Sequence, residues 1–366
     1  MNREKKPLLI VLIAGIGDLV LGSKSIRAIR NGFPDADIHL LTSTEAAPIA
    51  QNYRYLDHVL AFPIRELRNS KSHVLNIVRL IVKLRKKRFV SVVNLFVVAS
   101  WFGAFRMGLL FLLLKSQLKV GHDGKGFGIF LTKKAPPETF ENRHRVDAMM
   151  DIALQAGGRP DENGIDVFWN RSCEKKWSHL FETKGPYSNE TIVGLNPGGD
   201  RENKRWSPNK FAILGDKIIE KFGAKIILLG GPGEEDIAGH IEKKMRNGVV
   251  NLAGKLDLNE LTYITSKFDL LVTNDSGPMH IAAGVRAPLV AIFGPQIPTV
   301  VGPYTSERLC RLLYKHVDCR PCSKKRCAHP ICLDLITPDE VYEKCVELLE
   351  VNKSIFIPQV EGVSND

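Results

Sequence analysis

The chain has 366 residues, enough for two domains at about 100–200 residues each. Hydrophobic residues make up 44% and charged residues 25%, which excludes a disordered or fibrous chain. The net charge of +11 arises in the first half: residues 1–185 contain 29 basic and 17 acidic residues, and residues 186–366 contain 22 and 23. We therefore expect an anionic partner for the first half.

The first half alternates short β-rich runs with helical segments, a pattern typical of a parallel sheet covered by helices. Leu8–Ala14 is too short for a signal peptide and lacks its cleavage site, so it is predicted to be a buried strand. Further strands are predicted at 37–42, 59–62 and 90–95, and helices at 19–31, 74–87, 100–114 and 145–156.

Phe89–Leu114 is the longest apolar stretch, and by length alone it could span a bilayer. Polar residues, a glycine and Arg106 interrupt it. We therefore favour a β-branched strand, Val90–Phe96, followed by a partly exposed apolar helix, Ser100–Leu114, over a transmembrane helix.

The second half repeats the same alternation more tightly. Strands are predicted at 191–195, 225–229, 249–251, 268–273 and 289–293, with helices starting at Pro208, Glu235, Leu258 and Pro278. The domain boundary is placed in Ser172–Glu190, giving domains 1–180 and 190–350 and a tail 351–366. The predicted fold is α/β, with two Rossmann-like domains facing across a cleft at the carboxyl ends of their strands.

The first strand leads through Gly15 and Gly17 to Asp18 at the start of a helix. Glycines let the backbone approach a ligand, and a helix N-terminus favours negative charge. A dinucleotide fingerprint needs a third glycine where Val20 stands, so an NAD site is weakly supported. Asp18 is a candidate general base, although aspartate is also a common helix N-cap.

Two loops of the second half carry charged side chains suited to a nucleotide. Lys204 and Arg205 follow a glycine-bearing loop and are cations suited to diphosphate oxygens. Glu234 and Glu235 end a glycine-rich turn, where a carboxylate can accept hydrogen bonds from ribose hydroxyls. The alternative is that these two acids only stabilise the first turn of a helix.

A third loop runs from Asp275 through Ser276 and Gly277 into a helix that contains His280. Ser276 or Gly277 is predicted to cap this helix, whose free N–H groups can bind an anion. An isolated histidine there would more often be structural. Together with Asp275 and the other two loops, it is predicted to face a phosphate.

Four motifs in this order resemble glycosyltransferase family 9, the ADP-heptose:lipopolysaccharide heptosyltransferases. They are Gly15-Ile16-Gly17-Asp18-Leu19-Val20-Leu21, Lys204-Arg205-Trp206-Ser207-Pro208, Leu229-Gly230-Gly231-Pro232-Gly233-Glu234-Glu235, and the stretch from Leu252 through Asp275-Ser276-Gly277-Pro278-Met279-His280 to Pro295. One segment departs from the family pattern: 96–100 is more apolar than the polar turn expected after its strand.

The resemblance implies a GT-B fold with an acceptor domain followed by a nucleotide-sugar domain. It implies inversion at the anomeric carbon without a metal or other required cofactor. Asp18 matches the general base and Lys204 the donor-phosphate lysine. Glu234 or Glu235 matches the ribose-binding acid, and the donor-site signature matches Asp275, Ser276, Gly277 and His280.

The cationic run 83–88, with Arg65, Arg68 and Lys71 before it, lies near the apolar face Met107–Leu114. Anionic lipid attracts such clusters. We therefore expect a cytoplasmic protein in peripheral contact with the inner membrane, where a lipid-linked anionic glycan acceptor is presented. Nucleic acid is not expected, because interleaved aromatic residues and a binding motif are missing.

The cysteines all follow residue 172, and their odd number favours a reducing compartment over a disulfide scaffold. Four of them, Cys319, Cys322, Cys327 and Cys332, could bind structural zinc. The long interval between paired cysteines that is typical of such sites is missing, so we favour buried free thiols.

The sequence leaves three alternatives to a heptosyltransferase open. These are a transferase for another nucleotide-activated sugar on a cell-surface glycan, a sugar-nucleotide-binding paralogue without catalysis, and an NAD-dependent oxidoreductase. Asp18 together with Lys204 disfavours the paralogue, and Val20 disfavours the oxidoreductase.

Overall fold

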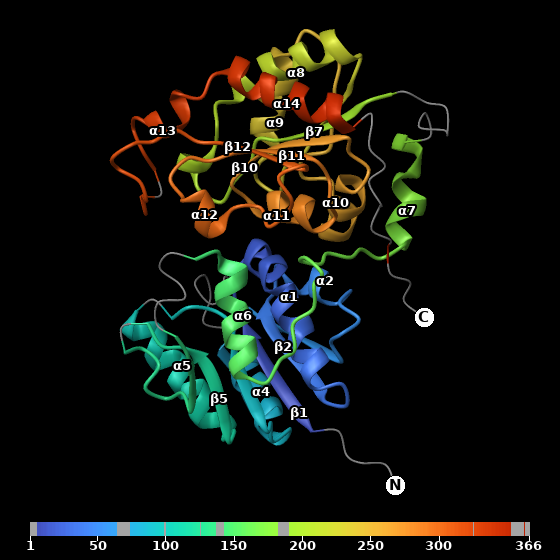
Figure 1. Cartoon of the computed structure of the whole chain (residues 1–366). Coiled ribbons are helices and arrows are strands. Elements are labelled where there is room, and N and C mark those ends of the chain that lie inside the picture. Colours follow the sequence, from blue (N-terminus) through green and yellow to red (C-terminus); the bar gives the residue numbers. More distant parts are fainter. Residues whose placement is uncertain are drawn as a thin grey trace. The chain divides into compact units, whose positions relative to one another are not determined.

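A computed structural model describes residues 6–63, 74–98, 100–124, 126–136, 143–181, 190–324, 326–352 and 362 (Figure 1). The predicted cations Arg65, Arg68 and Lys71 lie outside the described residues. The chain divides into two compact units, Met1–Asp166 and Val167–Asp366, so the division falls earlier than the predicted linker. Helix α7 (Ser172–Trp177) belongs to the second unit, where Lys176 pairs with Glu260.

The first unit is built on a six-stranded parallel sheet in the order β3-β2-β1-β4-β5-β6. Its strands are β1 (Pro7–Leu12), β2 (Asp37–Ser43), β3 (His58–Phe62), β4 (Ser91–Asn94), β5 (Leu118–His122) and β6 (Lys133–Ala135). Its helices are α1 (Ile16–Gly32), α2 (Ala47–Ala50), α4 (Val74–Lys86), α5 (Trp101–Leu114) and α6 (Arg145–Gln155). The central strand β1 is apolar along its length because both faces of the sheet are covered.

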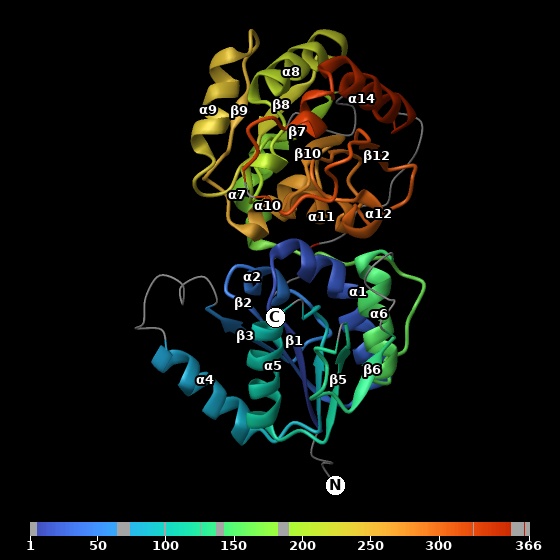
Figure 2. The same cartoon turned by 90° about the vertical axis from the view of Figure 1, so that its left-hand side faces the viewer.

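Helices α1 and α6 pack together, and α4 and α5 lie side by side (Figure 2). At the end of α1, a Cβ on Gly32 would lie 2.2 Å from the carbonyl oxygen of Gly157, so the backbones meet too closely for any larger residue. Leu84 of α4 and Phe111 of α5 share a core with Val92 of β4. These helices are therefore held on the sheet by their buried faces.

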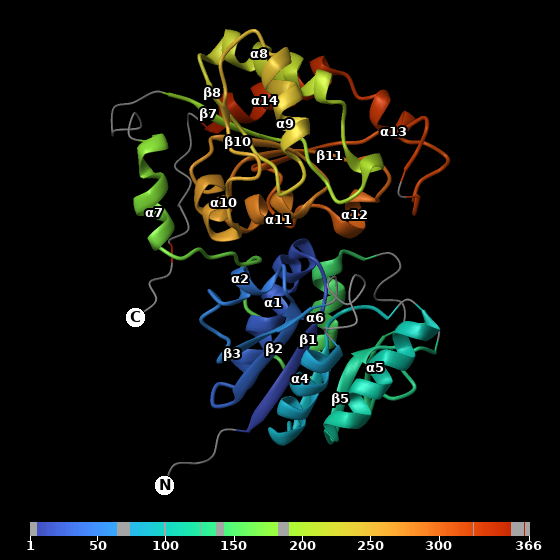
Figure 3. The ribbon, with the colours of Figure 1, turned by 180° about the vertical axis from the view of Figure 1, so that it is seen from behind.

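The second unit repeats this topology, with the sheet order β12-β11-β10-β7-β8-β9 (Figure 3). Its strands are β7 (Ile192–Asn196), β8 (Lys225–Leu228), β9 (Val250–Asn251), β10 (Leu270–Asn274), β11 (Leu289–Ile292) and β12 (Cys310–Leu313). Its other helices are η3 (Ser178–Phe181), η4 (Glu202–Lys204), α8 (Pro208–Phe222), α9 (Glu235–Lys244), α10 (Leu258–Thr265), α11 (Gly277–Gly284), α12 (Pro298–Val301), α13 (Ile331–Asp334) and α14 (Pro338–Asn352). Both units thus have the strand order of a Rossmann fold.

The predicted strands and helices are confirmed, with ends that differ by a few residues. The long apolar stretch forms strand β4 and helix α5, and Ser100 caps α5 by accepting a hydrogen bond from the Gly103 N–H. Within the described residues, every helix is too short or too polar to cross a membrane. Strands β5, β6 and β12, helix α14 and the short helices were not predicted; the short helices are α2, α7, η3, η4, α12 and α13.

Candidate functional site

Each unit has one place where the direction of strand order reverses: between β1 and β4 in the first, and between β7 and β10 in the second. Parallel sheets bind ligands outside the carboxyl ends of the strands at such a point. The candidate residues lie at these two edges. Asp18 follows β1, and the three loops of the second half follow β7, β8 and β10.

Asp18 lies in the first turn of α1, and the helix N-cap is Gly15 rather than Asp18. The interpretation of Asp18 as the N-cap is therefore wrong. Its side chain is 29% exposed, and its Oδ1 lies 3.7 Å from Nη1 of Arg145. The structure thus places an accessible carboxylate beside a cation at the predicted edge of the sheet.

Arg145 is a site residue that sequence reasoning missed. It is the first residue of α6, and its guanidinium carbon lies 5.7 Å from the centroid of the Phe96 ring. Phe96 stands in the turn after β4, where the Asn94 side chain donates to the Phe96 carbonyl at 2.8 Å. Three separate segments therefore bring an acid, a cation and an aromatic ring to one edge.

Two buried asparagines hold the loops of the second unit together. The Asn196 amide donates to the hydroxyls of Thr273 and Ser276, at 2.9 and 3.0 Å. The Asn274 amide donates to the carbonyls of Pro197 and Gly198, at 2.8 and 3.1 Å. Its oxygen accepts from the N–H of Trp206 at 3.1 Å. The loops after β7 and β10 are thus locked to each other.

Lys204 and Asp275 form the most buried ion pair of this edge. Nζ of Lys204 lies 2.9 Å from Oδ2 of Asp275, and the two side chains are 12% and 5% exposed. Asp200 adds a second carboxylate 3.4 Å from the same ammonium. Burial raises the pKa of Asp275 above its ordinary value, although the neighbouring Lys204 lowers it. The carboxylate of Asp275, which belongs to another loop, therefore holds Lys204 in place at the end of η4.

Glu234 ties the two glycine-rich loops together. Its Oε1 accepts from the Gly199 N–H at 2.7 Å, and its Oε2 accepts from the Gly231 N–H at 2.8 Å. A Cβ on Gly198 would overlap the Glu234 carboxylate, so a larger residue there would push that carboxylate out of its present position. Arg205 donates to the Gly199 carbonyl through Nε at 2.9 Å and Nη2 at 2.7 Å.

Glu235 and the start of α11 complete this edge. Glu235 is exposed and accepts from the Gly233 N–H at 2.7 Å. The N-cap of α11 is Ser276, and its hydroxyl makes no capping bond to the helix but accepts from Asn196. Gly277 is the first residue of α11, and the buried His280 lies one turn further along. The start of α11 can thus present N–H groups to an anion.

Replacing Glu234 by glutamine should destabilise the ligand-free protein, because one of its two acceptor oxygens becomes an NH2 group facing a backbone N–H. The loss of a hydrogen bond to a charged group costs about 1–3 kcal/mol, and about 2–4 °C of melting temperature follows for each kcal/mol. Thermal melting checks this, with Glu235→Gln as the exposed control that shifts less. A normal melting temperature combined with weaker stabilisation by nucleotide would instead make Glu234 a direct nucleotide ligand.

The cysteine cluster differs from the prediction of buried thiols. Cys332 is buried, but Cys319 and Cys327 are exposed. The four thiols line one small cavity of about 20 Å³ together with Arg320 and His329. All seven cysteines of the chain are free. Burial raises the pKa of the Cys310 thiol, which lies outside this cluster, to about 12.

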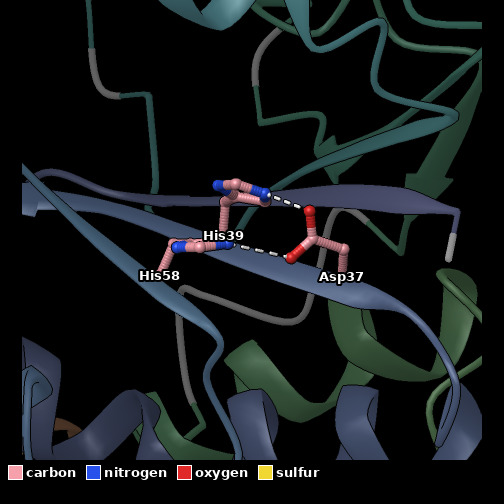
Figure 4. Close-up of side chains that lie close together, drawn as sticks. All are labelled: Asp37, His39 and His58. Atoms are coloured by element: carbon pink, nitrogen blue, oxygen red, sulfur yellow. Dashed lines mark hydrogen bonds and ion pairs between the residues drawn. The ribbon is translucent and has the colours of Figure 1, made fainter.

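Among the described residues, the side chains whose metal-binding atoms gather within 4.8 Å of one another are Asp37, His39 and His58 (Figure 4). Nε2 of His39 and Nε2 of His58 lie 2.9 and 3.2 Å from the two carboxylate oxygens of Asp37. Lys87 adds a cation 3.8 Å from the same carboxylate. These residues lie at the amino ends of β2 and β3, opposite the edge that carries Asp18. The carboxylate already has three partners, which indicates a structural role.

A family model described as glycosyltransferase family 9 (heptosyltransferase) matches residues 77–332. The chain belongs to glycosyltransferase family 9. The resemblance predicted from the four motifs is thereby confirmed. The match includes the loops that carry Lys204, Glu234 and Asp275.

Curated proteins of the family are similar to this chain over different lengths. Lipooligosaccharide heptosyltransferase 2 of Campylobacter jejuni subsp. jejuni serotype O:2 is 34% identical over 168 residues, which cover 43% of this chain and 51% of that protein. Lipopolysaccharide heptosyltransferase 1 of Campylobacter coli is 23% identical over 303 residues, which cover 78% of this chain and 83% of that protein. The chain spans about half the length of the first curated relatives that it matches.

Solved structures show the same fold. ADP-heptose lps heptosyltransferase II of E. coli matches with a TM-score of 0.73 at 20% identity, covering 95% of this chain and 99% of that one. A family 9 glycosyl transferase from Veillonella parvula matches with a TM-score of 0.77 at 20% identity, covering 96% of this chain and 99% of that one. The predicted α/β fold of the GT-B class, with two Rossmann-like domains, is confirmed.

Proposed function

We propose that this family 9 chain is an inverting glycosyltransferase that moves a heptose from ADP-heptose to a lipopolysaccharide inner-core acceptor. The observation that carries the proposal is the Lys204–Asp275 pair, which fixes a cation at the point where the second unit reverses its strand order. The names of the curated relatives support the sugar and the acceptor. Two similar solved structures are of E. coli heptosyltransferase WaaC with ADP and with ADP-2-deoxy-2-fluoro heptose, which supports the donor.

In the proposed reaction an acceptor oxygen forms a bond to the anomeric carbon while the bond from that carbon to the diphosphate oxygen breaks. Asp18 takes the proton of the acceptor hydroxyl as general base. Lys204, with Arg205 and the N-terminus of α11, stabilises the charge that develops on the departing ADP. Because these cations and N–H groups take the place of a divalent ion, we propose that no metal or other cofactor is required.

The donor contacts are assigned by the loops that hold each residue. Arg205 and Lys204 take the diphosphate, and the backbone N–H groups of Ser276 and Gly277 bind its oxygens beside His280. Asp275 keeps Lys204 in place. Of the two adjacent acids, Glu235 has the exposed carboxylate that can accept from ribose, while Glu234 holds the loops together.

For the acceptor, we propose a lipid-linked anionic glycan, reached from the cytoplasmic face of the inner membrane. Arg145 supports this proposal, because its guanidinium stands beside Asp18 and can bind a phosphate or carboxylate of the acceptor. The positive charge of residues 1–185 favours the same class of partner.

A thermal-shift panel of nucleotides tests the donor. ADP at about 100 times its Kd should stabilise the protein by about 2.7 kcal/mol, hence raise the melting temperature by roughly 5–10 °C. UDP, GDP and NAD should give smaller shifts, and EDTA should leave the ADP shift unchanged. A larger shift with UDP or GDP would indicate another nucleotide-activated sugar, and a larger shift with NAD would overturn the proposal.

A further inference from the structure

The outward face of α5 is apolar and exposed. Trp101, Phe105 and Leu112 are 66–68% exposed and lie at helical spacing along one stripe. Phe102 beside them is 67% exposed. The opposite face of α5 is buried, with Phe111 in the core of the first unit. An exposed row of large apolar side chains on a helix that is already packed indicates an interaction surface.

Helix α4 continues this surface. Its exposed apolar residues are Leu75, Val78 and Val82, which also recur at helical spacing, and α4 packs beside α5 (Figure 2). Ile129, in the loop between β5 and β6, is 78% exposed and lines a cavity of about 470 Å³ together with Trp101. We call the exposed apolar residues of α4, α5 and this loop the α4–α5 surface. They are Leu75, Val78, Val82, Trp101, Phe102, Phe105, Leu109, Leu112 and Ile129.

The charge around the α4–α5 surface has one sign. The 49 residues from 74 to 122 contain nine lysines and arginines and no aspartate or glutamate. At the C-terminal ends of α4 and α5, Arg85, Arg88 and Lys115 line a cavity of about 520 Å³. Arg88 and Lys115 both have φ 51°, a left-handed conformation that side chains other than glycine rarely adopt. The fold therefore holds cations at one end of an apolar surface.

The exposed apolar side chains and the positive charge around them distinguish a membrane from a protein partner or a second copy of this chain. A protein interface is depleted in lysine, and a second copy of this chain would bring the same positive charge. A helix that lies in a membrane interface has large apolar residues, such as tryptophan and phenylalanine, on one face and lysine and arginine around it. Anionic headgroups attract such cations. The apolar row and the uniform charge thus fit an anionic lipid bilayer.

We propose that the α4–α5 surface docks on an anionic phospholipid bilayer, with α5 lying in the interface and the cations of α4 on the headgroups. The 470 Å³ cavity beside α5 is lined almost wholly by apolar side chains and receives an acyl chain. Helix α5 starts just after the turn that contains Phe96, beside Arg145. Docking therefore brings lipid-linked molecules to the edge that carries Asp18. Only this consequence rests on the proposed function; the docking itself does not.

Vesicle co-sedimentation of the full chain tests the docking without any sugar transfer. We expect binding to phosphatidylcholine vesicles that contain about 30% phosphatidylglycerol, and at least about tenfold weaker binding to pure phosphatidylcholine. Adding about 0.5 M NaCl should also weaken binding, because it screens the headgroup charges. Equal binding to both kinds of vesicle, or none to either, would overturn the proposal.

Two variants test the two components of the surface. The triple variant Phe105→Ser, Leu109→Ser and Leu112→Ser should lose vesicle binding, and its exposed positions leave the core intact. The triple variant Lys83→Gln, Arg85→Gln and Lys86→Gln should bind at least about tenfold more weakly, since each cation near anionic lipid contributes about fivefold. Matched controls come from exposed residues of the second unit: Ile213→Ser with Leu335→Ser, and Lys243→Gln with Lys244→Gln.

Other occupants would leave different signatures. A dimer in light scattering that the serine variant converts to monomer, without vesicle binding by the wild type, would assign the surface to a second copy. Vesicle binding that persists in both triple variants would also overturn the proposal. The ADP thermal shift of each variant shows that it is folded, and that shift tests the proposed function separately.

Discussion

Asp18→Asn is expected to lower turnover by about 10²–10⁴-fold, the contribution of a positioned general base. Asparagine keeps the size and polarity of aspartate but cannot take the acceptor proton. ADP binds to residues of the second unit in our proposal, so the thermal shift with ADP should equal that of the wild type. Steady-state kinetics with a heptosyl donor and the thermal shift together measure both effects.

Asp147→Asn is the matched control for this variant. Asp147 occupies the first turn of α6 as Asp18 does that of α1, so both substitutions remove one carboxylate from a helix start. Each loses about 0.3–1 kcal/mol of favourable interaction with the helix dipole. If turnover falls equally in both variants, Asp18 only stabilises the start of its helix. Unchanged turnover in Asp18→Asn would refute its role as general base.

The central elements could be predicted from the sequence because the hydrophobic pattern of each one fits a single type of element. Leu8–Leu12 is fully apolar, as a strand covered on both faces must be, and the predicted helix after it appears as α1. The missed strands lie toward the edges of the sheets. β6 begins with two exposed lysines, and β12 is only partly buried. Edge strands bury fewer side chains, so they leave a weak hydrophobic pattern.

Local motifs placed the loops of the candidate site but not their internal partners. The glycine-rich turn indicated two adjacent acids, and only the structure distinguishes Glu234, which reaches the Gly199 N–H, from the exposed Glu235. Arg145 carries no motif, and its place beside Asp18 follows from the packing of α6 against α1. Contacts between segments so far apart in the chain depend on tertiary packing, which short spacings do not encode.

Lys204→Met is expected to lower turnover by about 10²–10³-fold, comparable to the loss of one preorganised donor to a developing negative charge. Methionine keeps much of the length of the lysine side chain but removes the ammonium that would face the diphosphate. The ADP thermal shift should shrink as well, which distinguishes this variant from Asp18→Asn. Lys217→Met, which breaks an exposed pair between Lys217 of α8 and Asp339 of α14, is the control that leaves turnover and the ADP shift unchanged.

The same substitution should also destabilise the fold in a pH-dependent way. Without Lys204, the buried Asp275 loses the cation that lowers its pKa, so its folded-state pKa rises further above the unfolded value. A raised carboxyl pKa leaves full stability below the unfolded pKa of about 3.9 and removes it as the pH rises through the folded value. Up to the folded-state pKa of Asp275 in the wild type, which is already raised, both proteins lose the same stability. The stability deficit of Lys204→Met relative to the wild type should therefore grow as the pH rises above that pKa, reaching up to about 3–5 kcal/mol.

The double variant Lys204→Met with Asp275→Asn separates the two roles of the lysine. Asparagine carries no charge, so the double variant should recover most of the lost stability and lose the pH dependence of the deficit. Turnover should stay low, because the ammonium that stabilises the departing diphosphate is still missing. Recovery of turnover together with stability would show that Lys204 only holds Asp275 in place, and denaturant unfolding across pH 4–8, run beside the kinetics, decides between the two.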